Sequence, residues 1–167
     1  TGSSLAGLKV VNLDSQYQVL VFNTAANLYG VIYDSTNNTF GSITLIRTAT
    51  FSSGNYFMPV KVSSTSVLVC SCDSTTAFQA VLLSTSGTTI TVNTAATATL
   101  AGNFTSFNDV IVCGSSYVFA YRRATNVAAV RAFTVSGTTV TIGSESTLSG
   151  TTVNGIFKTS ASTFMAV

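Results

Sequence analysis

Charged side chains are the first candidates for chemistry in this chain, and they are few. Its 167 residues include five acids, seven bases and no histidine. Histidine is the commonest general base, so its absence removes Ser-His-Asp and Cys-His arrangements. Hydrolysis of a glycosidic bond uses two facing carboxylates, and no two acids here are close in sequence. We assign no catalytic residue to the acids, which are Asp14, Asp34, Asp73, Asp109 and Glu145.

Three of these acids fall near expected strand ends or turns. They are Asp34, Asp73 and Asp109. Asp favours such places because its side chain accepts hydrogen bonds from the turn backbone. We interpret these residues as structural, although a fold could still bring distant acids together.

The three cysteines, Cys70, Cys72 and Cys113, are expected to be small buried apolar side chains. Cys70 and Cys72 are two residues apart on an expected strand, which puts both on one face. That spacing gives poor disulfide geometry. Zinc is not expected, because histidine is absent and no fourth ligand appears. With no calcium loop and no Gly-rich phosphate loop either, we predict no metal and no cofactor.

Arg122 and Arg123 form the only adjacent pair of basic residues. A nucleic-acid site needs a clustered basic patch with interleaved aromatic residues. We therefore interpret the pair as a solvated strand end and predict no nucleic-acid partner. Tyrosine rings could bind a sugar, but most fall on expected strand positions, which favours the core or the contacts between repeats. The tyrosines are Tyr17, Tyr29, Tyr33, Tyr56, Tyr117 and Tyr121.

The composition is apolar and poor in charge. Charged residues make up 7% of the chain, against about 25% in an average soluble domain. Hydrophobic residues make up 46%, which supports a core and argues against disorder. Solubility must come from Ser, Thr and Asn, a style common on extracellular and particle surfaces. No stretch approaches the roughly 20 apolar residues of a membrane helix, so we predict no membrane span.

An internal repeat is visible in the chain. The segment 86–92 (SGTTITV) recurs at 136–142 (SGTTVTI), an offset of 50 residues. At the same offset, 66–69 (SVLV) aligns with 116–119 (SYVF). A fixed period of this length is the signature of a repeat architecture.

A more diverged copy precedes these two. Its segment 19–21 (VLV) aligns with 67–69 at an offset of 48, and 37–40 (NNTF) takes the place of 87–90 (GTTI). Asn can replace Gly in a tight turn because it tolerates positive φ. A fourth copy starts near 156–167 and is incomplete.

Each copy is predicted to form four short strands joined as hairpins. In the second copy we expect strands at 58–63, 66–72, 77–84 and 88–93, followed by a connecting segment at 94–107. The strand at 66–72 is apolar on both faces, which is typical of an inner strand covered on both sides. No window has the apolar period of a helix. The sequence therefore predicts an all-β chain of repeated four-stranded antiparallel units.

Four strands at a period near 48–50 residues match a β-propeller blade. The strand order, the SGTT turns and the Thr-Leu-x-Gly exits at 99–102 and 147–150 resemble the degenerate propeller repeats of phage tail and virion proteins. The resemblance implies about three and a half blades. A β-sandwich or a β-solenoid is the alternative. The expected repeats are 1–50, 51–102, 103–150 and the incomplete 151–167, together forming one domain or part of a larger propeller.

An incomplete last repeat leaves an apolar edge, which proteins normally cover. Either the chain, which starts at Thr1 without Met, is a segment of a longer protein, or another copy supplies the missing strands. We favour the first explanation.

The leading functional hypothesis is a non-enzymatic structural or adhesion module of an extracellular or virion assembly. Its partners would be other structural subunits or copies of itself. The alternative is a carbohydrate-binding, receptor-binding propeller that contacts surface glycans. Matching sugar sites should repeat, yet Tyr117 aligns with Val67, and Arg131 with Val81. A glycan-degrading enzyme is the third hypothesis.

Overall fold

The computed structural model describes residues 5–51, 57–73, 77–99, 104–123, 127–150 and 155–166, the side chains of 99, 104–109 and 123 excepted. These residues form β-strands and no helix, which confirms the all-β prediction. Accordingly, no described segment is a helix long and apolar enough to cross a membrane.

Four antiparallel sheets follow one another along the described chain. The first sheet contains β1 (Gly7–Asn12), β2 (Tyr17–Asn23), β3 (Asn27–Asp34), β4 (Thr39–Phe40) and β5 (Thr44–Thr48). The second contains β6 (Phe57–Ser63), β7 (Ser66–Cys72), β8 (Ala77–Ser86) and β9 (Thr89–Thr99). The third contains β10 (Phe104–Cys113), β11 (Ser116–Arg123), β12 (Val127–Ser136) and β13 (Thr139–Thr147). The fourth is the hairpin of β14 (Ile156–Lys158) and β15 (Phe164–Ala166).

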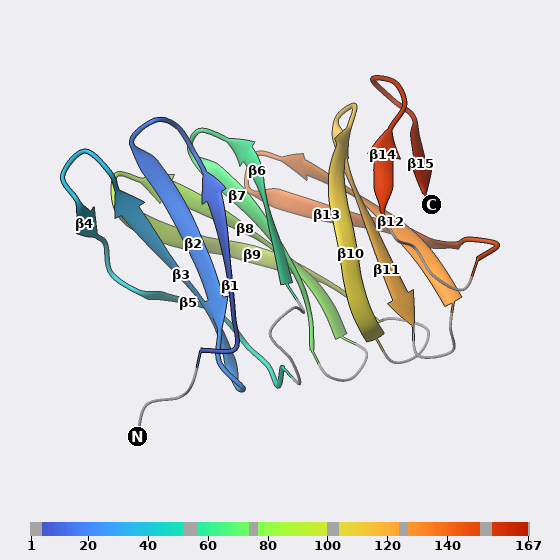
Figure 1. Cartoon of the computed structure of the whole chain (residues 1–167), viewed down its shortest axis with the longest axis horizontal. Helices are drawn as coiled ribbons and strands as arrows, with labels where there is room; N and C mark the ends of the chain where they lie inside the picture. Colours follow the sequence, from blue (N-terminus) through green and yellow to red (C-terminus); the bar gives the residue numbers. More distant parts are fainter. Residues whose placement is uncertain are drawn as a thin grey trace.

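The sheets stand in a row, each facing the next (Figure 1). Within the second and third sheets, each strand pairs with the one that follows it in sequence. In the first sheet β4 and β5 both pair with β3. The first strands of successive sheets are neighbours: β1 contacts β6, β6 contacts β10, and β10 contacts β14. The equivalent edge of every sheet therefore lies on the same side of the row.

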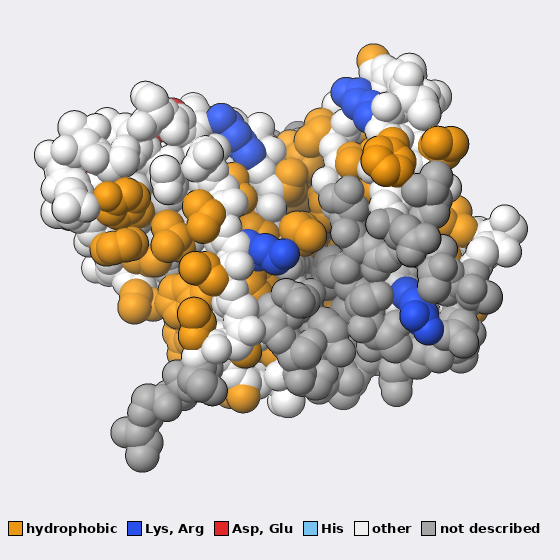
Figure 2. Space-filling model, viewed as in Figure 1, with side chains coloured by type: hydrophobic (Ala, Val, Ile, Leu, Met, Phe, Trp, Pro, Cys, Tyr) orange, Lys and Arg blue, Asp and Glu red, His pale blue; other side chains and the backbone are white. Residues whose placement is uncertain are grey.

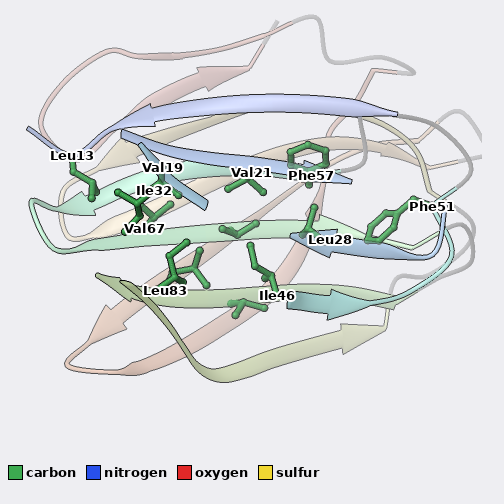
Figure 3. Packing of buried hydrophobic residues seen from close by; sticks show 13 residues of the cluster. Leu13, Val19, Val21, Leu28, Ile32, Ile46, Phe51, Phe57, Val67 and Leu83 are labelled. Atoms are coloured by element: carbon green, nitrogen blue, oxygen red, sulfur yellow. The ribbon is translucent and has the colours of Figure 1, made fainter. Parts of the chain in front are cut away.

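The core consists of the layers between these sheets. One cluster joins the first and second sheets, another joins the second and third, and a smaller one joins the third sheet to the hairpin. Along β7 the side chains alternate, so that Val67 and Val69 face the first sheet while Leu68, Cys70 and Cys72 face the third. Figure 3 shows the first layer, in which side chains of the first sheet, such as Val21 and Ile32, lie beside Val67 and Leu83 of the second. The predictions for this strand and for the two cysteines are confirmed.

The repeated turns depend on residues that adopt positive φ. Gly87 has φ 55° and Gly137 has φ 57°, each as the first of two turn residues. In the first sheet Asp34 pairs with Thr39, so four residues form the turn, and the last of them, Asn38, has φ 52°. The prediction that Asn37 takes the place of Gly87 is therefore wrong: the first sheet has a longer turn, and the residue with positive φ is Asn38 at its end. The side chain of Asn38 also accepts a hydrogen bond from the Tyr33 hydroxyl at 2.8 Å.

The expected connection at 94–107 is wrong. β9 continues to Thr99, and β10 begins at Phe104. A register shift between Val81 and Leu83 lets β9 keep pairing with β8, down to Ala77 opposite Thr99. The Thr- and Ala-rich composition suggested a linker, but Thr favours strands and Ala is small enough to lie on a half-buried one.

The alignment of the first repeat is wrong by one residue at β2. The sequence aligns Val19 with Val67, and both lie in the layer between the first and second sheets. Val19 therefore faces the sheet that follows its own, whereas Val67 faces the sheet that precedes its own. Leu20 occupies the place of Val69, since their partners on β3 and β8 are equivalent valines. A one-residue slip exchanges the faces of a strand, and it leaves an apolar match intact when both faces are apolar.

We expect Gly137→Ala to lower the free energy of unfolding by about 1 kcal/mol, because a residue with a Cβ is strained at positive φ. An added methyl group meets nothing within 4 Å, so crowding plays no part. Gly137→Asn is the matched control and should lose less, since Asn tolerates this conformation. Urea denaturation measures both. Equal losses in the two variants would contradict the explanation.

Candidate functional site

Two of the acids hold turns together. Asp14 accepts backbone N–H groups of Tyr17 at 2.7 Å and Gln16 at 2.8 Å, and these bonds lower the pKa of Asp14. Asp34 accepts the side-chain amide of Asn37 at 2.8 Å, which is the main cause of its lowered pKa. Both carboxylates are therefore ionised at neutral pH and bound to their own loops. This confirms the interpretation of Asp34 as a turn residue.

Arg47 on β5 reaches from the first sheet to the second. Its Nη1 donates to the Ser71 carbonyl oxygen at 3.1 Å and to the Ser71 hydroxyl at 2.9 Å. Its Nη2 donates to Asp73 Oδ2 and to the Ala77 carbonyl oxygen, both at 3.2 Å. The guanidinium also lies over the Phe51 ring, 5.9 Å from its centroid. One side chain thus binds both ends of the loop that joins β7 to β8.

This contact, the Arg47 clamp, is almost closed to solvent. The Arg47 side chain is 7% exposed and that of Asp73 is 17% exposed. Burial lowers the pKa of Arg47 while the charge of Asp73 opposes that shift, and arginine remains charged at neutral pH. Asp73 also accepts the backbone N–H of Ala77 at 3.1 Å. The clamp is therefore a structural ion pair between two sheets.

A second charged cluster lies on the third sheet. The Tyr121 hydroxyl donates to the Glu145 carboxylate, and Arg131 Nε donates to the Tyr121 oxygen at 3.1 Å. Arg131 also pairs with Glu145 at 3.8 Å and donates to the Gly143 carbonyl oxygen at 3.2 Å. Burial, and then the bond to Glu145, raise the pKa of Tyr121. The phenol stays protonated at neutral pH and acts as a donor.

Each of these acids is thus beside an arginine of its own, and Asp73 and Glu145 belong to different sheets. Across the described residues, no group of three or more Cys, Asp and Glu could hold a metal ion. The side chains of Asp109 and Arg123, and the whole of Tyr56, are outside the described part of the chain. What these two charged clusters do is join strands and sheets.

The tyrosines divide into two groups. Tyr117 and Tyr121 are buried between the second and third sheets, and Tyr17 packs against the layer between the first and second. This confirms the prediction of core packing for these three. Tyr29 and Tyr33 belong to none of the core clusters and lie on the opposite face of the first sheet. That face is the candidate interaction site.

The outer face of the first sheet points away from the second sheet and is apolar. Cross-strand partners share a face, so the pairings of β1 to β5 identify its members. Its apolar members are Leu8, Val10, Leu20, Phe22, Tyr29, Val31, Tyr33, Phe40 and Leu45, and the polar side chains of Asn12, Gln18, Asn27 and Thr48 lie at its margins. None of them is charged. Figure 2 shows hydrophobic side chains gathered over this sheet, on the left of the view.

Side chains at the margins of the outer face are open to solvent, four of its rings form two pairs, and Val31 at its centre is buried. Val10 is 52% exposed, Leu45 50% and Phe40 63%. The Phe22 and Tyr29 rings stack with centroids 5.6 Å apart, and those of Tyr33 and Phe40 are 4.9 Å apart. Single exposed apolar residues are normal, but a contiguous patch of them marks an interaction surface.

The corresponding face of the other large sheets is covered. In the second sheet it contains Val69 and Val81, which pack on the first sheet. In the third it contains Phe119 and Phe133, which pack on the second sheet. The outer face thus has the composition of a face that receives a neighbouring sheet.

Sequence reasoning missed this face because of the one-residue slip at β2. In that alignment Leu20 and Phe22 fall on the side that faces the second sheet. The signal that could have found them is the pairing of β2 with β3, where Phe22 is opposite Tyr29 and Leu20 is opposite Val31.

Comparison with known proteins gives no relative. No protein-family model and no curated protein matches the chain, and no solved structure matches its fold.

We expect Arg47→Met to lower the free energy of unfolding by about 3 kcal/mol, because it leaves the partly buried Asp73 carboxylate without its cation. The double variant Arg47→Met/Asp73→Asn should lose less than the single variant, since no unpaired charge remains. Urea denaturation of these two variants, of the single variant Asp73→Asn and of the parent chain measures the differences. If the double variant loses as much as the sum of the two single changes, the pair is not a coupled clamp.

Proposed function

We propose that this chain is a non-enzymatic structural or adhesion module of an extracellular or virion assembly. In this proposal its repeated sheets are blades of a larger β-propeller. The observation that carries it is the stacking itself: the second and third sheets are buried on both faces by their neighbours. Such a chain is organised to continue by adding sheets.

Several features support the blade interpretation. Each of the second and third sheets is a four-stranded meander, as propeller blades are. The first strands of successive sheets are side by side, which is the arrangement expected around a common axis. The resemblance to phage tail and virion repeats supports the location, as does a surface rich in hydroxyl and amide groups.

The charged residues support a structural role. Arg47 and Asp73 tie the first sheet to the second, and Arg131 and Glu145 join strands of the third. Asp14 and Asp34 are held by their own turns. These groups are engaged in holding the fold, and a substrate would have to displace those bonds to use them.

We expect the protein to be found in the extracellular or particle fraction of its source. An antibody against the 167-residue chain, used on fractions separated by density-gradient centrifugation, measures this distribution. Co-sedimentation with particles, together with labelling of their surface in electron microscopy, would support the structural role. Recovery of the chain only as a soluble cytoplasmic monomer would refute it.

One observation favours carbohydrate binding as a second candidate. The paired rings of Phe22 with Tyr29 and Tyr33 with Phe40 lie on an open face, and aromatic faces can stack against sugar rings. The ligands would be surface glycans, as for a receptor-binding propeller.

A glycan array tests this candidate. Binding should fall at least about tenfold in Phe40→Ala, which removes an exposed ring and its contact with the sugar. Thr91→Ala, an exposed change on the second sheet, is the control. An array without a binder would retire the candidate.

A further inference from the structure

The outer face of the first sheet is built like the faces that other sheets cover. Leu20 and Val31 pair across β2 and β3 in the same way as Val69 and Val81 pair across β7 and β8. Val69 and Val81 are almost fully buried by the first sheet. The outer face has the same strand positions and the same apolar chemistry, yet nothing described covers it.

A second open face lies at the other end of the row. The hairpin of β14 and β15 covers the third sheet with Ile156, while Phe157 and Met165 form a cross-strand pair. Phe157 is 56% exposed and Met165 is 51% exposed. We call the face of a sheet that points toward the preceding sheet in the chain its backward face, and the opposite one its forward face. The described stack therefore has one open apolar backward face, on the first sheet, and one open apolar forward face, on the hairpin.

The outer face of the first sheet and the open face of the hairpin could pack together in the way that successive sheets of this chain do. Throughout the row a backward face packs on a forward face, and first strands are neighbours. The same rule would place β14 and β15 of one copy over β1 and β2 of another. Leu8, Val10, Leu20 and Phe22 would then meet Phe157 and Met165 without any charge in the contact.

The size of the contact fits an assembly with more than one of them. A four-stranded face is roughly 20 Å on each side, and a two-stranded hairpin covers about half of it, less than the ~800 Å² per partner of a standard interface. Two copies can form the contact twice.

We propose that the outer face of the first sheet binds a second copy of this chain, head to tail, against the forward face of the C-terminal hairpin. The inference rests on the proposed function, because it names the partner of the stacking module. The unpaired forward and backward faces within one chain carry it.

Sedimentation velocity of the 167-residue chain at about 1 to 100 µM measures the association. We expect a species of at least twice 17.3 kDa that grows with concentration. Val10→Lys at one face and Met165→Lys at the other should each raise the dissociation constant at least about tenfold, because each buries an unpaired charge. Thr91→Lys, exposed on the second sheet, is the control and should leave it unchanged. Circular dichroism confirms that each variant is folded.

Mixing the two variants separates head-to-tail contact from other pairings. Each variant retains one intact face, so a one-to-one mixture should associate more strongly than either variant alone. A mixture that stays monomeric would overturn the proposal. So would an assembly that Met165→Lys does not weaken, since that result means contact between two outer faces.

The remaining outcomes are equally decisive. A parent chain that is monomeric at every concentration overturns the inference, and a glycan that binds the outer face of that monomer identifies the other kind of occupant. The proposed function fails separately, through the fractionation of the source. A chain that co-sediments with particles but is monomeric in solution refutes only the self-association.

Discussion

The structure depends on one constraint: a sheet that is apolar on both faces must be covered on both faces. Each fully buried Val or Leu side chain contributes about 1.5 to 3 kcal/mol relative to an exposed one, and β7 offers such residues to both sides. A single neighbouring sheet can cover only one of these two faces. The second sheet therefore exists between two others, and the row of sheets follows from this local requirement.

The same constraint explains where charge is tolerated. A charge placed in a layer between sheets must have its partner supplied there, because water is excluded. Arg47 satisfies this by binding Ser71 and the Ala77 carbonyl on the neighbouring sheet, and Asp73 in the loop between their two strands. With only 7% charged residues in the chain, such sites are few, and each of them orients one sheet or strand against another.

Local patterns were sufficient to predict most of the strands, the repeat and the two glycine turns. The glycine at position 87 or 137 and the alternation along 66–72 are of this kind. The face of the sheet on which a side chain lies could not be predicted in this way. In a strand that is apolar on both faces, Val19 and Leu20 are equivalent as sequence, and only their partners across the sheet distinguish inside from outside. The Arg47 clamp is also out of reach, because it joins residues 24 to 30 positions apart through two sheets.

The repeats are alike in backbone but not exchangeable in volume. Between the second and third sheets, Phe78 contacts both Phe119 and Phe133, with centroids 5.1 and 5.3 Å away, beside small neighbours such as Cys70 and Ala80. The residue of the second sheet that is equivalent to Phe119 is Val69, and it packs against aliphatic side chains of the first sheet. Because interiors are packed at crystal-like density, large side chains need small ones opposite them. The order of sheets is thus specified by complementary volumes, while the hydroxyl-rich turns that sequence comparison detects most readily carry no information about which sheet is next.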